Sequence, residues 1–219
     1  MFNIKKLKKL GYGDSISFKV HIVKENLRYL QDRIRFSIDD MEEYSRFIVK
    51  FFIDIYVSNL ETDTDTKAGF LEGYYILPEE FMEYSNFFDV CDAHSQELSD
   101  MACSLIGKNL KLKEEYANNE DCICYVSDFY IYKKFRNCGI GSYVISELQD
   151  ILFYYASDVI TKTILLPKSR VLTNQRRLQN ISDKNQNREQ LFKQLVKFYK
   201  INGFEFIKGK DYMWRDEKF

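Results

Sequence analysis

The stretch DFYIYKKFRNCGIGSYVISEL, residues 128–148, joins a strand-like segment to an amphipathic helix through a turn with two glycines. Such a turn exposes several backbone N–H groups at the start of the helix, where the helix dipole also favours negative charge. Gly139 and Gly141 would let the backbone approach a ligand closely and adopt positive φ angles. The turn is therefore a candidate phosphate-binding site, although a tight strand–helix connection alone would also account for the two glycines.

The spacing of the glycines excludes two common nucleotide-binding motifs. The GxxxxGKS/T sequence of a P-loop is missing, and Val144 stands where the third glycine of a dinucleotide-binding GxGxxG would lie. The five cysteines, an odd number without CxxC spacing, favour reduced thiols over a disulfide framework or a zinc site. We therefore expect no metal, and we interpret Cys138 as a residue that fills space in the turn.

Composition limits the class of protein. The 219 residues are 45% hydrophobic and 16% aromatic, which is enough for a large core. A formal net charge of -1 argues against a dedicated nucleic-acid-binding protein. The chain has no apolar run of about 18 residues and no cleavable signal segment, and Phe2 stands where myristoylation would need glycine. We expect a cytoplasmic protein that does not enter a membrane.

Hydropathy patterns predict a mixed α/β fold around one sheet. Strands are expected at 15–23, 47–57, 69–77, 121–132 and 159–166, with two short ones in the terminal GFEFI and DYMW sequences. Helices are expected at 40–46, 93–106, 140–155 and 188–201. Asp92 is the expected N-cap of the second helix, and residues 59–69 the tip of a hairpin. Neither an internal repeat nor a linker divides the chain, so we expect a single domain over 1–219.

Two motifs, in this order, resemble the signatures of the GCN5-related N-acetyltransferase (GNAT) superfamily. RNCGIG, residues 136–141, looks like the family's R/Q-x-x-G-x-G/A pyrophosphate loop and follows the strand residue Ile131 by five positions. FYKINGFEF, residues 198–206, is similar to the second signature, aromatic-Tyr-x-x-x-Gly-Phe at the end of the last long helix. The resemblance covers 121–207 and implies an α/β fold with a single mixed, mostly antiparallel central sheet flanked by helices.

The resemblance also implies an activity, the transfer of an acetyl group from acetyl-CoA to a primary amine by direct attack on the thioester. Backbone groups of Phe129 and Ile131 would bind the pantetheine arm like an added strand. Arg136 would add a charge-assisted contact to the pyrophosphate. The main-chain N–H groups of the turn would hold the pyrophosphate; these belong to Arg136, Asn137, Cys138, Gly139, Ile140, Gly141 and Ser142.

Two residues are candidates for proton transfer. Tyr199 matches the family tyrosine that protonates the coenzyme A sulfur, although its position also fits a core aromatic residue on the apolar face of the last helix. Asp128 lies eight residues before Arg136 and is a candidate general base, with strand-end capping as an equally good alternative. His94, expected in the first turn of a helix, is a weaker candidate base.

The chain departs from the family pattern at several positions. Lys133 replaces the usual proline, and Phe192 stands where many relatives carry an asparagine. Residues 168–190, with six basic and two acidic side chains, are longer than the typical connection. They form either a solvated loop or, through Arg176 and Arg177, a contact with the coenzyme's 3′-phosphate.

The identity of the acceptor cannot be read from the sequence, and small-molecule and protein amines both fit. A catalytically silent GNAT-like module for binding or regulation is the main alternative. A nucleic-acid-associated protein that uses residues 168–190 is more remote, since the total charge is near neutral. Whether the chain forms a homodimer stays open.

Overall fold

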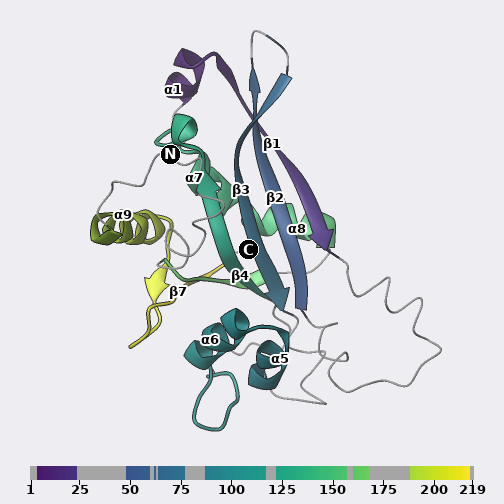
Figure 1. Cartoon of the computed structure of the whole chain (residues 1–219), viewed down its shortest axis with the longest axis vertical. Coiled ribbons are helices and arrows are strands. Elements are labelled where there is room, and N and C mark those ends of the chain that lie inside the picture. Colours follow the sequence, from purple (N-terminus) through teal and green to yellow (C-terminus); the bar gives the residue numbers. More distant parts are fainter. Residues whose placement is uncertain are drawn as a thin grey trace, which may run out of the picture.

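The computed structural model describes residues 4–23, 48–59, 62, 64–76, 87–116, 122–156, 160–167 and 188–217. Seven strands in these ranges form one sheet with the order β1-β2-β3-β4-β5-β7-β6 (Figure 1). Their bounds are β1 Tyr12–Val23, β2 Ile48–Asn59, β3 Thr64–Ile76, β4 Cys122–Ile131, β5 Ile160–Leu165, β6 Glu205–Phe206 and β7 Met213–Asp216. Only the β4–β5 pair is parallel. The prediction of a mixed α/β fold with one mostly antiparallel sheet is confirmed.

Helices flank this sheet on both faces. Their bounds are α1 Ile4–Lys9, α5 Phe87–His94, α6 Gln96–Leu105, the 3-10 helix η2 Lys133–Phe135, α7 Ile140–Ser146, α8 Leu148–Ala156 and α9 Arg188–Ile201. In Figure 1, α5 and α6 lie together at one end of the sheet, α8 lies behind the strands, and α9 stands to the side near β6 and β7. The segment that links β4 to α7 is thus placed on the side of the molecule where α9 lies.

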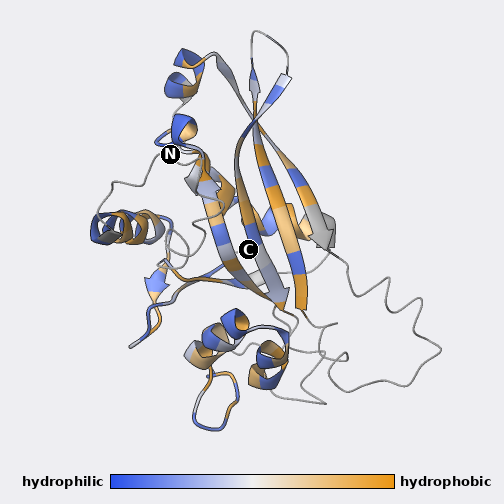
Figure 2. Cartoon of the chain, in the orientation of Figure 1, coloured by the Kyte–Doolittle hydropathy of each residue, from blue (hydrophilic) through white to orange (hydrophobic). Residues whose placement is uncertain are grey.

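Two apolar clusters form the core, one on each face of the sheet. Successive strand residues lie on opposite faces, and apolar and polar residues follow one another along the strands in Figure 2. Phe51, Ile53 and Ile55 of β2 are fully buried in the first cluster, which also includes α7 and α8 residues. Tyr125 of β4 is fully buried in the second cluster, together with residues of α5 and α6. The alternation of apolar residues along β2 therefore marks the face of the strand that is buried in the first cluster.

Two predicted helices are in fact pairs of helices. The prediction of one helix over 93–106 is wrong at its start, because α5 ends at His94 and α6 begins at Gln96. The side chain of Ser95 accepts the Leu98 N–H at 3.3 Å and is the N-cap, whereas Asp92 lies inside α5. The 140–155 helix is interrupted at Glu147, where the chain leaves α7 before α8 begins.

Several other boundaries differ from the prediction. The third strand begins at Thr64 rather than at 69, since β2 and β3 pair as far as Asn59 opposite Thr64, so the hairpin tip is shorter than expected. The last strand is displaced to Met213–Asp216, and helix α1 was not predicted. The predicted helix at 40–46 and residues 168–187 lie outside the described residues. In the part of the chain that is described, no helix is long and apolar enough to span a membrane.

Candidate active site

A β-bulge places the candidate base, Asp128. The β3–β4 register pairs Glu72 with Asp128 but Gly73 with Val126, so Ser127 is an extra residue on β4. The Ser127 hydroxyl donates a hydrogen bond to the Glu72 carbonyl at 3.2 Å. Because side chains alternate along a strand, one extra residue moves Asp128 to the opposite face from Val126. Asp128 is therefore half-buried beside Glu72, outside the apolar cluster that contains Val126.

Beyond this bulge, β4 continues without β5 beside it. The parallel ladder between the two strands ends at Leu165, whereas β4 runs on to Ile131. On the other side, the Tyr132 N–H donates to the Ala68 carbonyl of β3 at 2.8 Å. Backbone groups alternate between the two edges of a strand, so those of Phe129 and Ile131 point away from β3. This edge has the geometry that binds an extended ligand as an added strand.

The chain turns from β4 into α7 through η2 and two residues with positive φ, Asn137 at 60° and Gly139 at 83°. The first hydrogen bond of α7 runs from the Tyr143 N–H to the Gly139 carbonyl at 3.0 Å. The N–H groups of residues 140–142 precede this bond, and such groups have no partner within a helix. The predicted turn residues differ in exposure: Cys138 and Ile140 are buried, Arg136, Gly139, Gly141 and Ser142 are half-buried, and Asn137 is exposed.

Arg136 folds back along the end of β4. Its Nε donates to the Ile131 carbonyl at 2.9 Å, and its guanidinium carbon lies 5.0 Å from the centroid of the Tyr130 ring. Its own carbonyl accepts a hydrogen bond from Lys6 Nζ of α1 at 2.8 Å. The turn is therefore linked both to the end of β4 and to the N-terminal helix. Nothing in the sequence indicates this contact of Lys6, because it depends on the packing of α1.

Tyr199, the candidate proton donor, comes from α9 and has 6% of its surface exposed. Burial, and secondarily the carboxylate of Asp128, raise the pKa of the Tyr199 phenol above its usual value. The second cause means that the two candidate proton-transfer residues lie within electrostatic reach of each other. The sequence placed them on two different elements, and the fold brings those elements together.

The ring of Phe198 lies between β4 and the start of α7. Its centroid is 6.3 Å from that of Phe129, and its Cζ atom is 3.2 Å from the point that a Cβ atom on Gly141 would occupy. Phe198 thus contacts both segments that we expect to bind the coenzyme. In the sequence, the only signal for this role is that Phe198 is the aromatic residue before Tyr199 in the second motif.

Cys138 has the properties of a buried, unreactive thiol. Burial raises the pKa of the Cys138 thiol, while the nearby Lys6 ammonium acts in the opposite direction. Its Sγ atom lies 3.7 Å from the carbonyl oxygen of Arg136. Since the thiolate is the nucleophilic form of cysteine, a raised pKa disfavours attack by this residue. His94 is the last residue of α5 rather than part of a first turn, and its ring lies edge-on to Tyr74.

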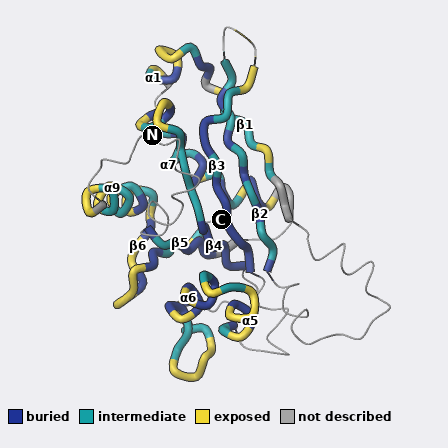
Figure 3. Tube along the Cα trace, viewed as in Figure 1, coloured by how far each residue is buried: buried dark blue, intermediate teal, exposed yellow. Residues whose placement is uncertain are grey.

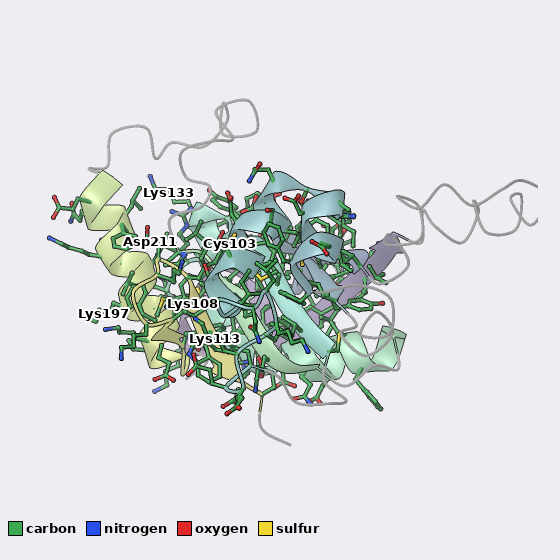
Figure 4. The ribbon with its side chains drawn as sticks, turned by 90° about the horizontal axis from the view of Figure 1, so that it is seen from below. Cys103, Lys108, Lys113, Lys133, Lys197 and Asp211 are labelled. Atoms are coloured by element: carbon green, nitrogen blue, oxygen red, sulfur yellow. The ribbon has the colours of Figure 1, made fainter. Side chains whose placement is uncertain are left out.

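A shallow concavity of about 450 Å³ lies elsewhere, between the outer face of α9 and β6. This face of α9 is exposed in Figure 3, and Lys197, one of the lining residues, points outward in Figure 4. Phe192, where the family pattern has an asparagine, also lines it, and neither Asp128 nor Tyr199 does. Among the residues that the structure describes, no group of three or more His, Cys, Asp or Glu side chains is arranged to hold a metal ion.

No protein-family model matches the chain, and neither does any curated protein. Arabidopsis thaliana NAA60 in complex with a bisubstrate analogue is 15% identical with a TM-score of 0.36, over 91% of this chain and 94% of that one. AtaTR bound with AcCoA is 9% identical with a TM-score of 0.38, over 93% and 95%. Arabidopsis thaliana Naa50 in complex with the bisubstrate analogue CoA-Ac-MVNAL is 14% identical with a TM-score of 0.33, over 94% and 99%.

Proposed function

We propose that this protein is an N-acetyltransferase that transfers an acetyl group from acetyl-CoA to a primary amine of a small molecule or a protein. The observation that carries this proposal is the open edge of β4, which leads into the glycine-containing turn. Asp128, on β4, lies within electrostatic reach of Tyr199 on α9. The resemblance of residues 136–141 and 198–206 to GNAT signatures supports the same reaction.

In this proposal the two parts of acetyl-CoA bind to two neighbouring segments. The amide groups of the pantetheine arm pair with the backbone groups of Phe129 and Ile131, which point away from β3. The pyrophosphate binds the N–H groups of residues 136–142, and the adjacent guanidinium of Arg136 adds positive charge. The thioester then lies near the bulge at Ser127, because β4 runs from the bulge towards the turn.

The chemistry requires two proton transfers. The amine nitrogen attacks the thioester carbonyl carbon, and a C–N bond forms while the C–S bond breaks. Asp128 accepts the proton that the amine loses, directly or through a water molecule. Tyr199 donates its phenolic proton to the departing thiolate and is protonated again from solvent. The Tyr199 phenol is protonated throughout the neutral range, and because burial raises its pKa, its proton transfer depends on close placement beside the departing sulfur.

One observation favours the second candidate, a catalytically silent module. The ring of Phe198 lies against both Phe129 and the Gly141 position, so a coenzyme bound there would have to displace or pack on it. If the ring blocks the coenzyme, Phe198→Ala should bind acetyl-CoA more tightly than the wild type does. If the ring packs on the coenzyme, the same substitution should weaken binding.

The test has two steps. Isothermal titration calorimetry of the wild type with acetyl-CoA first measures binding, and release of free thiol is then followed with a panel of amines and peptides. Binding followed by amine-dependent thiol release is the expected result. Binding without turnover of any amine would favour the silent module. Absence of acetyl-CoA binding would refute the acetyltransferase, and binding gained by Phe198→Ala would then favour the silent module.

A further inference from the structure

A largely buried ion pair at the end of the C-terminal strand contacts the neighbouring strand β5. Nη2 of Arg215, on β7, lies 2.5 Å from Oε2 of Glu217, and the two side chains are only 14% and 6% exposed. Oε1 of Glu217 also accepts a hydrogen bond from Oγ1 of Thr163 on β5, at 2.5 Å. Because the carboxylate is held from both sides, the guanidinium of Arg215 has a fixed position and orientation.

The same guanidinium reaches the ends of two helices. Nη2 of Arg215 donates to the Ile145 carbonyl at 3.0 Å, and Nη1 donates to the Asn202 carbonyl at 3.1 Å. Ile145 lies in the last turn of α7, and Asn202 directly follows α9. Carbonyl groups at the end of a helix lack partners within it and carry partial negative charge, so a cation stabilises them. One side chain therefore binds both helix ends.

These two helices carry the two halves of the candidate site. The glycine-containing turn leads directly into α7, and α9 bears Tyr199. Short contacts connect Arg215 to this tyrosine, since its guanidinium carbon lies 5.0 Å from the Phe204 ring, and the Phe204 N–H donates to the Tyr199 carbonyl at 3.0 Å. The rings of Tyr199 and Phe204 are 5.6 Å apart.

We propose that Arg215, held by Glu217, is a positioning residue that fixes the distance between α7 and α9. It thereby fixes the distance between the coenzyme-binding turn and the Tyr199 phenol. This inference rests on the proposed acetyltransferase function, in which both groups must act on one coenzyme molecule. Arginine suits the role because its planar fork can donate to two carbonyl groups and one carboxylate at the same time, which a lysine ammonium cannot do in this geometry.

The test variant is Arg215→Met/Glu217→Gln. Removal of Arg215 alone would leave the buried Glu217 carboxylate without its cation. This uncompensated charge would destabilise the fold whether or not Arg215 positions the helices. The glutamine can still accept the Thr163 hydrogen bond, so the double variant removes the Arg215–Glu217 ion pair and the bonds to the two helix ends. The matched control is Lys162→Met/Asp216→Asn, which removes an ion pair of 2.9 Å between β5 and β7 and touches neither helix end.

Two measurements decide the proposal. In the test variant, hydrogen exchange followed by mass spectrometry should become faster at the C-terminal ends of both α7 and α9, and acetyl-CoA should bind about tenfold more weakly. The control variant should show neither change. The positioning role would be overturned if hydrogen exchange and acetyl-CoA affinity in the test variant stayed as in the wild type. Equal changes in the control variant would overturn it as well. A wild type that does not bind acetyl-CoA would refute the proposed function, whereas hydrogen exchange would still decide whether Arg215 couples the two helices.

Discussion

Tyr199→Phe removes one hydroxyl group and keeps the aromatic ring that α9 packs into the core. The ring centroid of Tyr199 lies 5.1 Å from that of Phe198 and 5.6 Å from that of Phe204, and both contacts survive the substitution. We therefore expect the free energy of unfolding to change by no more than about 1 kcal/mol, the usual contribution of one hydrogen bond. The variant should fold, which makes its kinetics interpretable.

The effect on catalysis should be much larger than the effect on stability. A positioned general acid contributes roughly a hundred- to ten-thousand-fold, which corresponds to about 3–5 kcal/mol of transition-state stabilisation. The phenol transfers its proton only while the C–S bond breaks, so kcat should fall on this scale. Binding of acetyl-CoA in the ground state should change little. Because burial raises the pKa of Tyr199, the phenol is a weaker acid than a free tyrosine, so the loss on Tyr199→Phe measures what its position next to the sulfur contributes.

The assay is a single-turnover measurement of thiol release with an accepted amine. Tyr212→Phe is the matched control, since Tyr212 is also a buried tyrosine but belongs to the cluster on the other face of the sheet. The control should keep the wild-type rate. If Tyr199→Phe also keeps it, in a regime where chemistry limits turnover, Tyr199 is a core aromatic residue and the proposed acid must be sought elsewhere.

Three further predictions follow from the same geometry. Gly139→Val and Gly209→Val each force a β-branched residue into positive φ, at 83° and 73°, and should cost similar stability, but only Gly139→Val should abolish acetyl-CoA binding by calorimetry. Asp128→Asn removes the carboxylate that helps to raise the Tyr199 pKa, so spectroscopic titration should find that pKa lower than in the wild type, and activity should fall most at low pH, where the amine is protonated. Because the folded state holds the Tyr199 proton more tightly than the unfolded chain, the free energy of unfolding should decline as pH rises above about 10, and urea titrations of Tyr199→Phe should lack this part of the decline.

The elements around the turn could be predicted because their signals are local. Alternating residues, a turn with Gly139 and an apolar stripe lie within one continuous stretch, and the structure places a strand, a turn and a helix there. Capping was harder to assign, because Asp92 and Ser95 both have side chains suited to an N-cap. Only the position of Ser95, which accepts the Leu98 N–H, shows that two helices meet there.

The features that join distant segments could not be predicted from local patterns. The contacts of Arg215 with Ile145 and Asn202 cross between β7, α7 and α9, and nothing next to Arg215 in the sequence indicates them. The link from Lys6 to the turn is of the same kind. Such contacts depend on how the elements pack, whereas periodicity describes one element at a time.

The bulge at Ser127 shows how one strand serves both the core and the candidate site. Without the extra residue, Asp128 would share a face with Val126 and point into an apolar cluster, where an unpaired carboxylate would cost several kcal/mol. Phe129 would move in the opposite direction and lose its packing on that cluster. With the bulge, Phe129 and Ile131 stay in contact with the core while Asp128 is half-buried on the other face. The strand therefore keeps its apolar packing on either side of a charged residue, and that residue remains within electrostatic reach of Tyr199.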